Sequence, residues 1–330
     1  MDDIGDIGSI SRRVGHLRDD GITPKTLLGP GYSRPYHGLR RPQGCELEQP
    51  AQRIADAIGL MTKGCVLTGW ASRFIQGQVY NDGESFGREH PVTILCGPGS
   101  HLRQRKGIRP RERRWLPGEV VDLGDGLIVT TMARATYDDM LDAANQVEAL
   151  VSVEMATSTV IEHARTSLDN IRRVFNAHVK TRGRRQAGWA LDHACTRSAS
   201  PWETRTRMLA TDAVGYEHWR VNIPLFDLRE NLLGIGDLLD PVAGYVIESD
   251  GADHRRVTVH DADNVREERF ENHGLEVVRI GAAQHSRAER PTTIERIRDG
   301  RDRARRQQIK LWTTDKPAWW WDWPPGRRWD

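Results

Sequence analysis

Residues 232–251 read LLGIGDLLDPVAGYVIESDG, two apolar runs separated by turn-forming proline and glycine. Apolar runs of this length between turn residues predict β-strands, and we expect strands over residues 232–238 and 243–247. Asp237 lies within the first run, and Glu248 directly follows the second. If the two strands are hydrogen-bonded neighbours, both carboxylates can point to the same face and the same end of a sheet.

The sequence on either side of these strands predicts a mixed α/β (α+β) fold. A small polar run over residues 196–200 ends at Pro201, which can open a helix, so it marks the clearest domain boundary. The other elements that we expect after this boundary are a helix over 202–211, a strand over 219–226, a helix over 261–274 and a strand over 275–280. The predicted order is therefore αβββαβ.

Asp237 and Glu248 predict a site for a divalent cation, because two adjacent anions need a positive charge. Mg²⁺ takes oxygen ligands, usually one or two carboxylates together with water and substrate phosphate. The chemistry that such a site supplies is metal-assisted hydrolysis of a phosphodiester.

Plainer alternatives for the same acidic residues stay open. Asp237 and Asp240 could flank a turn, and Glu248 could end a solvated strand before an Asp-Gly turn. A third carboxylate, Glu203 on the preceding helix, stands three residues after a serine and equally fits a capping box.

Five separated motifs of this region together resemble a known family. They are SPWETR at 200–205, Gly236-Asp237, VIESDG at 246–251 with His254, a D-x-x-R-x-x-x-[LF]-x-x-x-G spacing from Asp263 to Gly274, and Val278-Arg279. In this order they are similar to the short endonuclease-like domain related to the very-short-patch-repair nucleases, over about residues 197–310. That family has the PD-(D/E)XK restriction-endonuclease-like fold.

The resemblance implies that Asp237 and Glu248 ligate Mg²⁺, with Glu203 near the metal or orienting a water molecule. Asp250 stands where the wider superfamily has a lysine that polarises the attacking water, so the identity of the general base stays open. His254 is a candidate for that role or for holding the leaving group, because imidazole exchanges protons near neutral pH. The alternative for His254 is a turn histidine bonded to nearby backbone.

Two arginines on the expected helix after the site are candidates for phosphate contact. Arg266 and Arg269 stand three residues apart and so share one helix face. Arg266 also lies on the family motif, which favours phosphate contact there. If this face points away from the site, both arginines only solvate the helix and pair with acids such as Glu267.

The front of the chain predicts a winged helix. We expect two short helices around a break at residues 21–24, followed by an extended pair around residues 36–40. HGLRR at 37–41 resembles the wing of AbiEi-type antitoxin-like proteins, and GCVLTGWA at 64–71, with a T-x-x-x-R-x-x-x-D spacing at Thr130, Arg134 and Asp138, resembles their middle region. A winged helix implies duplex binding, with one helix in the major groove and the wing on the backbone.

A basic run between His101 and Trp115 holds seven lysines and arginines against one acid, Glu112. Cations near phosphates release condensed counterions, so this run could extend the contact with DNA. The residues that we expect to do so are Arg103, Arg105, Lys106 and Arg109. The alternative is a solvated arginine-rich loop.

Length and composition indicate how these motifs are divided among domains and which partners they allow. The 330 residues predict several domains: a winged-helix-like DNA-binding region over 1–50, a mixed α/β antitoxin-like middle domain over 51–196, the nuclease-like domain over 197–310 and a Trp-rich tail over 311–330. The net charge of +2 supplies no field for the whole molecule, so DNA must be attracted by local patches. The four cysteines form no CxxC pair and indicate neither a zinc site nor a disulfide framework.

The chain has neither a signal-like start nor an apolar run long enough for a membrane helix, so we expect a cytoplasmic protein without membrane contact. The sequence predicts a Mg²⁺-dependent DNA endonuclease, a hydrolase targeted by its N-terminal DNA-binding region. The alternative is a DNA-binding regulator of antitoxin type whose nuclease fold is catalytically silent. An RNA-directed nuclease, a protein partner and a homo-oligomer all stay open.

Tryptophan is concentrated at one end of the sequence. Six of the 11 tryptophans fall within the last 19 residues. We expect them to cover an apolar patch of the nuclease-like domain; the alternatives are stacking on bases and binding a partner.

Overall fold

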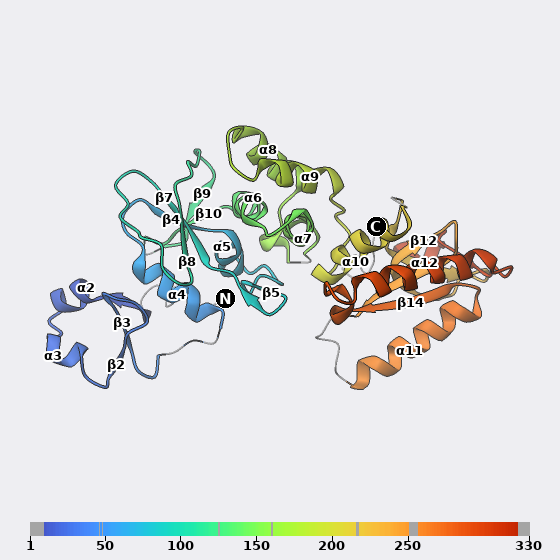
Figure 1. Ribbon diagram of the computed structural model, residues 1–330, viewed down its shortest axis with the longest axis horizontal. Helices are drawn as coiled ribbons and strands as arrows, with labels where there is room; N and C mark the ends of the chain where they lie inside the picture. Colours follow the sequence, from blue (N-terminus) through green and yellow to red (C-terminus); the bar gives the residue numbers. More distant parts are fainter. Residues whose placement is uncertain are drawn as a thin grey trace. The chain divides into compact units, whose positions relative to one another are not determined.

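The computed structural model describes residues 10–45, 47, 49–124, 126–159, 161–215, 218–250 and 257–322, with backbone alone over 257–264. The chain forms two compact units, which are described separately below. The first comprises Met1–Ala143 and Ile161–Leu191, and the second comprises Ala144–Val160 and Asp192–Asp330. Both units mix helices with β-sheet, as expected for the α+β class (Figure 1).

The first unit begins with short elements around a small sheet. They are β1 (Arg12–Arg13), α2 (Val14–Asp19), α3 (Pro24–Leu27), β2 (Tyr32–Ser33) and β3 (Leu39–Pro42), with the strands in the antiparallel order β1-β3-β2. The hydroxyl of Thr23 accepts from the backbone N–H of Thr26 and so caps α3. The expected pair of short helices and the extended pair that follows them are therefore present.

A five-stranded sheet forms the centre of the first unit. Its strands are β4 (Cys65–Thr68), β7 (Val92–Cys96), β8 (Ile108–Arg111), β9 (Val120–Asp122) and β10 (Ile128–Thr130), in the order β8-β7-β4-β10-β9. Helices α4 (Ala51–Leu60) and α5 (Gly69–Ile75) and the hairpin of β5 (Glu84–Ser85) and β6 (Arg88–Glu89) accompany it. Ile54, Leu67 and Ile94 are fully buried between these elements.

Apolar spacing predicts one helix over residues 137–155, but the structure has two. They are α6 (Met132–Asp142) in the first unit and α7 (Gln146–Ser158) in the second. The chain is extended at Ala143, and the side chain of Asn145 accepts from the backbone N–H of Glu148, starting a new helix. Apolar residues continue at helical spacing through this break, but the extended backbone at Ala143 ends α6 and the Asn145 cap begins α7.

Amphipathic spacing also predicts a helix over residues 158–175, and the structure divides this stretch as well. The structure has a single 3-10 turn, η1 (Glu162–Ala164), and then α8 (Leu168–Ala177), which is capped by the hydroxyl of Ser167. Helix α9 (Arg184–His193) follows, close to the expected range of 184–195.

The second unit contains the expected αβββαβ order. Its elements are α10 (Pro201–Val214), β11 (Arg220–Asp227), β12 (Leu232–Asp240), β13 (Tyr245–Asp250), α11 (Val257–Asn272) and β14 (Glu276–Gly281). After them come η3 (Ala282–His285), α12 (Arg290–Arg306), β15 (Trp312–Thr313) and η4 (Ala318–Asp322). The sheet order is β14-β13-β12-β11-β15, and β13 and β14 are the parallel pair.

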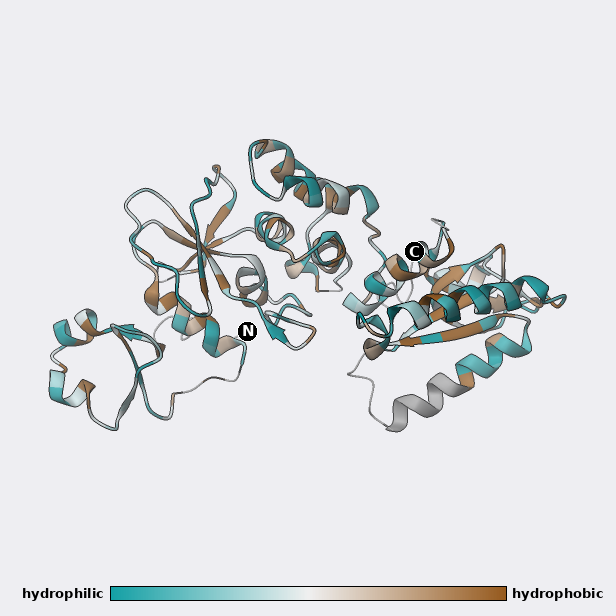
Figure 2. Ribbon diagram, viewed as in Figure 1, coloured by the Kyte–Doolittle hydropathy of each residue, from teal (hydrophilic) through white to brown (hydrophobic). Residues whose placement is uncertain are grey.

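Helices pack on both faces of this sheet (Figure 1). Leu209 of α10 and Ile297 of α12 share one apolar core with Ile247 of β13, and Phe270 of α11 shares another with Val246 of the same strand. Figure 2 shows hydrophobic residues concentrated on the strands. Successive residues of β13 alternate between the two cores, so Glu248 faces the same side as Val246, toward α11.

Helix α7 packs against α10 within the second unit. Its Glu154 is fully buried and accepts hydrogen bonds from the hydroxyls of Ser198 and Thr204, each at 2.6 Å, and from the backbone N–H of Cys195 at 2.7 Å. Arg207 adds an ion pair to the same carboxylate. These contacts assign residues 144–160 to the second unit, whereas the sequence placed them in a middle domain.

The described tryptophans near the C-terminus pack on the second unit. Trp312 lies on β15, which pairs with β11, and Trp320 is fully buried with its ring centroid 5.5 Å from that of Phe226. Trp319 and Trp321 are partly exposed. Trp323 and Trp329 lie outside the described residues. None of the described helices combines the length and apolar character needed to cross a bilayer.

Candidate functional site

The two strand carboxylates lie on the same face of the second unit's sheet. In the antiparallel pair of β12 and β13, Leu239 stands opposite Val246 and Leu238 opposite Ile247. Continuing this register by one residue places Asp237 opposite Glu248, and side chains that stand opposite one another share a face. The backbone N–H of Ser249 donates to Oδ2 of Asp237 at 2.8 Å, which holds the two strand ends together.

Glu248 is buried, with 6% of its surface exposed. Arg266 of α11 donates from Nη2 to its Oε2 at 2.6 Å. Its other oxygen, Oε1, is buried and has no hydrogen-bond partner among the described residues. A buried carboxylate oxygen without a partner is costly, and a cation or a proton would relieve that cost.

Glu203 in the first turn of α10 has a structural role. Its backbone N–H donates to the hydroxyl of Ser200, and its Oε2 accepts from the backbone N–H of Ala199 at 2.8 Å. The side-chain amide of Asn222 on β11 donates to the same Oε2 at 2.6 Å. The capping alternative holds in part: Ser200 caps α10, but the Glu203 side chain accepts from Ala199 and not from the N-cap Ser200.

Electrostatics connects the three acids. Burial, followed by the negative charge of Asp237, raises the pKa of Glu203 to about 7. The same two causes raise the pKa of Glu248 to about 8, although the neighbouring guanidinium of Arg266 opposes the shift. Like charges that raise each other's pKa values mark a local excess of negative charge. A divalent cation would compensate that excess.

Asp237 and Asp240, which could both flank a turn, have different contacts in the structure. Asp240 is fully buried and caps the turn before β13, because its Oδ1 accepts from the backbone N–H groups of Val242 and Ala243. Its Oδ2 accepts from Nε of Arg301 at 2.8 Å. The turn interpretation therefore fits Asp240, whereas Asp237 contacts the neighbouring strand at Ser249.

Glu248 and Asp237 suit the oxygen-ligand set of Mg²⁺, since that ion is commonly held by one or two carboxylates with water. No group of three His, Cys, Asp or Glu side chains in the described part of the chain converges as a metal-binding cluster. Asp250, at the end of β13, is exposed and stands opposite Gly281 of β14. His254 lies outside the described residues.

The two candidate arginines of α11 differ in position. Arg266 reaches Glu248, and its side chain lies so close to β12 that a Cβ at Gly234 would come within 2.8 Å of its Cγ. Arg269 is exposed on the helix surface. The structure thus brings Arg266, but not Arg269, to the carboxylates.

Two residues near these acids were not predicted as site residues. Arg279 on β14 stands opposite Glu248, pairs with Glu267 at 2.8 Å and helps to lower the pKa of Glu248. Its place in the Val278-Arg279 motif is a signal that could have indicated it. Asn222 carries no such signal, because only the fold brings it to Glu203.

In the first unit, the predicted basic residues have different surroundings. Nη1 of Arg105 donates to the backbone carbonyl of His37, and the hydroxyl of Tyr36 donates to that of Lys106. This part of the basic run therefore touches the segment predicted as the wing. Arg103 and Lys106 are exposed, whereas Nη1 of Arg109 lies 3.7 Å from Oδ2 of Asp142.

The spaced Thr130, Arg134 and Asp138 form a buried network. Oγ1 of Thr68 lies 2.9 Å from that of Thr130 and donates to Oδ2 of Asp138, which also accepts from Nε of Arg134 at 3.0 Å. Nη1 of Arg134 donates to Glu119 at 2.6 Å. This motif therefore ties β4, β10 and α6 together inside the first unit.

Comparison of the chain with protein-family models, curated proteins and solved structures found no match.

Proposed function

We propose that the second unit is a Mg²⁺-dependent nuclease domain of the PD-(D/E)XK type, which hydrolyses phosphodiester bonds of DNA bound through the N-terminal region. The observation that carries this proposal is the buried Oε1 of Glu248, which has no partner in the described structure and lies beside the facing Asp237. The αβββαβ order of the unit and its resemblance to endonuclease-like domains support the same function.

Asp237 and Glu248 would hold the ion, with Oε1 of Glu248 available as a ligand. The ion would supply charge neutralisation at the scissile phosphate and a water molecule of lowered pKa. Arg266 favours the anionic form of Glu248, and its positive charge would attract a phosphate group. Glu203, whose pKa is about 7, exchanges protons near neutrality and suits the role of general base or acid.

A plasmid-nicking assay tests this function. The wild type, Asp237→Asn and Glu248→Gln would be incubated with plasmid DNA in Mg²⁺ and in EDTA, with a labelled RNA in parallel. Asp299→Asn, on the exposed face of α12, is a matched control that removes one carboxylate away from the site. Cleavage by the wild type and the control in Mg²⁺ alone would support the proposal. Equal cleavage by all four proteins, or in EDTA, would contradict the mechanism.

The second candidate is a DNA-binding regulator whose nuclease fold is silent. The observation that favours it is the ion pair of Arg266 with Glu248 at 2.6 Å, which places a cation on one oxygen of a proposed ligand. Salt-sensitive duplex binding without metal, together with no nicking at any Mg²⁺ concentration, would identify this function.

A further inference from the structure

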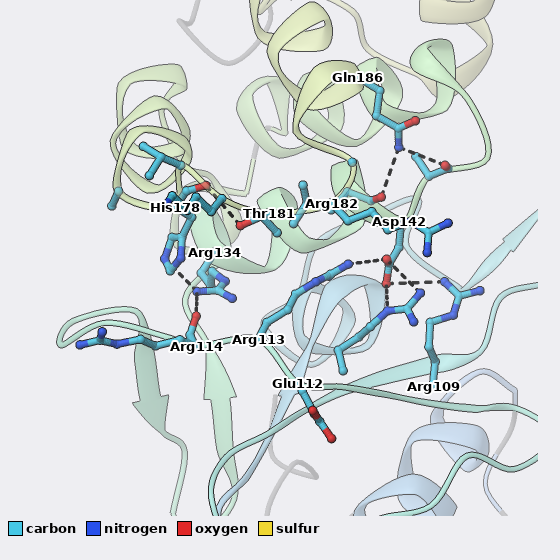
Figure 3. Close-up of a pocket in the computed structure, with 17 residues that line it drawn as sticks. Arg109, Glu112, Arg113, Arg114, Arg134, Asp142, His178, Thr181, Arg182 and Gln186 are labelled. Atoms are coloured by element: carbon cyan, nitrogen blue, oxygen red, sulfur yellow. Dashed lines mark hydrogen bonds and ion pairs between the residues drawn. The ribbon is translucent and has the colours of Figure 1, made fainter.

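The first unit contains a pocket of about 840 Å³, within the range of roughly 300–1,000 Å³ that is usual for ligand sites. Three segments line it: residues 109–114 at and after β8, residues 141–143 at the end of α6, and residues 177–186 between α8 and α9 (Figure 3). All three belong to the same unit, so the pocket does not depend on the carboxylates of the second unit.

Cations dominate the pocket wall. Arg109, Arg111 and Arg113 all approach the carboxylate of Asp142, at 3.7, 3.1 and 2.5 Å (Figure 3). One carboxylate therefore faces three guanidinium groups. Asp142 positions these side chains but leaves most of their charge uncompensated.

A fourth arginine, Arg134, lies at the back of the pocket with 1% of its surface exposed. Asp138 and Glu119 hold it in place at 3.0 and 2.6 Å, and Arg113 also reaches Asp138. The guanidinium of Arg134 is therefore fixed by buried partners.

Three further cations line the pocket: Arg114, Lys180 and Arg182. They are exposed, and none of them has an ion-pair partner among the described residues. With the four arginines already named, the pocket has seven cationic side chains. Four acids oppose them, namely Asp138, Asp142, Glu119 and Glu112, which leaves a surplus of three positive charges with His178 neutral.

The pocket offers charge and little aromatic surface. None of the described residues that line it is Phe, Tyr or Trp, and the ring of His178 is stacked on Tyr137 and hydrogen-bonded to Glu119. A ligand would therefore be recognised mainly by its anionic groups.

We propose that this pocket binds two or three consecutive phosphate groups of a nucleic-acid strand, with Arg114, Lys180 and Arg182 as the contacting residues. The choice of nucleic acid as the source of the phosphates rests on the proposed function, whereas the pocket itself does not. The phosphate contacts in this part of the chain then come from these three side chains, and the arginines paired with Asp142 fix the shape of the wall.

Binding of two probes to the full chain in EDTA tests the proposal. The probes are fluorescein-labelled tetrathymidylate, a single strand too short to span a duplex-binding surface, and inorganic tripolyphosphate, measured by anisotropy and by calorimetry. The test protein is Arg114→Ala/Arg182→Ala. The matched control is Arg173→Ala/Arg185→Ala, which removes two exposed arginines of the same unit that do not line the pocket.

We expect the test variant to bind tetrathymidylate at least about tenfold more weakly than the wild type and the control. Its slope of log affinity against log salt should fall by about 0.7 for each phosphate that the protein no longer neutralises. Tetradeoxyadenylate should bind as tetrathymidylate does. Binding of tripolyphosphate alone would keep the phosphate site but overturn the nucleic-acid source.

Three results would overturn the proposed phosphate site. They are no binding of either probe, a test variant that binds as tightly as the wild type, or a control variant that loses as much affinity as the test variant. Asp237→Asn separates this proposal from the nuclease. It should abolish cleavage without changing binding of either probe, and equal loss of probe binding in Asp237→Asn would place the probe at the second unit. Thermal unfolding checks that the variants fold.

Discussion

Arg266 of α11 donates from Nη2 to Oε2 of Glu248 at 2.6 Å, while the other oxygen of that carboxylate is buried without a partner in the described structure. One carboxylate oxygen of Glu248 is thus paired with a positive charge, and the other oxygen is not. Burial and Asp237 raise the pKa of Glu248 to about 8, and Arg266 opposes the shift. The protonation state of Glu248 near neutral pH therefore depends on this ion pair.

Replacing Arg266 with methionine should raise the pKa of Glu248 further, because a lowering cause is lost while the aliphatic part of the side chain still packs against Gly234. An opposite charge at this distance is worth roughly one to three pKa units. A carbon-13 titration of the Glu248 carboxyl would measure the shift. Arg269→Met, on the exposed face of α11, is the control and should leave the titration unchanged.

The stability contributed by Glu203 and Glu248 should fall as pH rises from about 4.5 to 8. The folded-state pKa values of Glu203 and Glu248, about 7 and about 8, exceed the ordinary value of 4.5. The folded state then binds more protons than the unfolded state, so the stability contributed by these groups is present at low pH and is lost as pH rises through the raised pKa values. Urea unfolding at several pH values measures the slope, and Glu203→Gln/Glu248→Gln should flatten it.

The histidine near α10 has the opposite effect in a more acidic range. Burial, followed by the charge of Arg205, lowers the pKa of His285 to about 4 from 6.5. Its stabilising contribution is therefore present above pH 6.5 and is lost as pH falls toward 4. In urea unfolding, the stability of His285→Gln relative to the wild type should rise as pH falls from 6.5 to 4 and should stay constant above pH 6.5. A variant with the wild-type acid profile would contradict this assignment.

Asp237→Asn should stabilise the metal-free protein at pH 8, because the charge that raises the pKa values of Glu203 and Glu248 is removed. The amide oxygen can still accept from the backbone N–H of Ser249. Mg²⁺ should stabilise the wild type, by about 2.7 kcal/mol at a hundredfold excess over Kd, and should not stabilise the variant. Calorimetric unfolding with and without Mg²⁺ measures both effects, and an equal gain in both proteins would contradict the metal site.

Gly300 provides a test of the packing of α12 on the sheet. A Cβ at this position would lie 2.8 Å from Oη of Tyr245 and 2.9 Å from Cγ2 of Val278. Gly300→Ala should therefore lower the free energy of unfolding by about 1–3 kcal/mol despite the better helix propensity of alanine. Asp299→Ala, an exposed neighbour on the same helix, should leave stability within about 0.5 kcal/mol of the wild type in urea unfolding.

Local patterns in the sequence predicted much of the second unit. The apolar runs and turn residues between 232 and 251 predicted the two strands, and the structure adds the pairing of β12 with β13 on which the common face of Asp237 and Glu248 depends. Contacts between residues far apart in the sequence could not be predicted from these local patterns. Nothing near Arg111 indicates that it pairs with Asp142, and nothing near Glu203 indicates Asn222, because these contacts depend on the folded chain.

Helix α7 has a consequence for how this chain can be divided. The polypeptide passes between the two units after Ala143, after Val160 and after Leu191, so the second unit is not a continuous stretch of sequence. A gene fragment starting at residue 197 would encode Arg205 and Arg207 but omit Glu148 and Glu154, their acidic partners on α7. Both arginines would lose these ion pairs, and α10 would lose the helix that packs on it. The second unit could therefore be transplanted into another protein only together with α7, which precedes residue 197 by some forty residues.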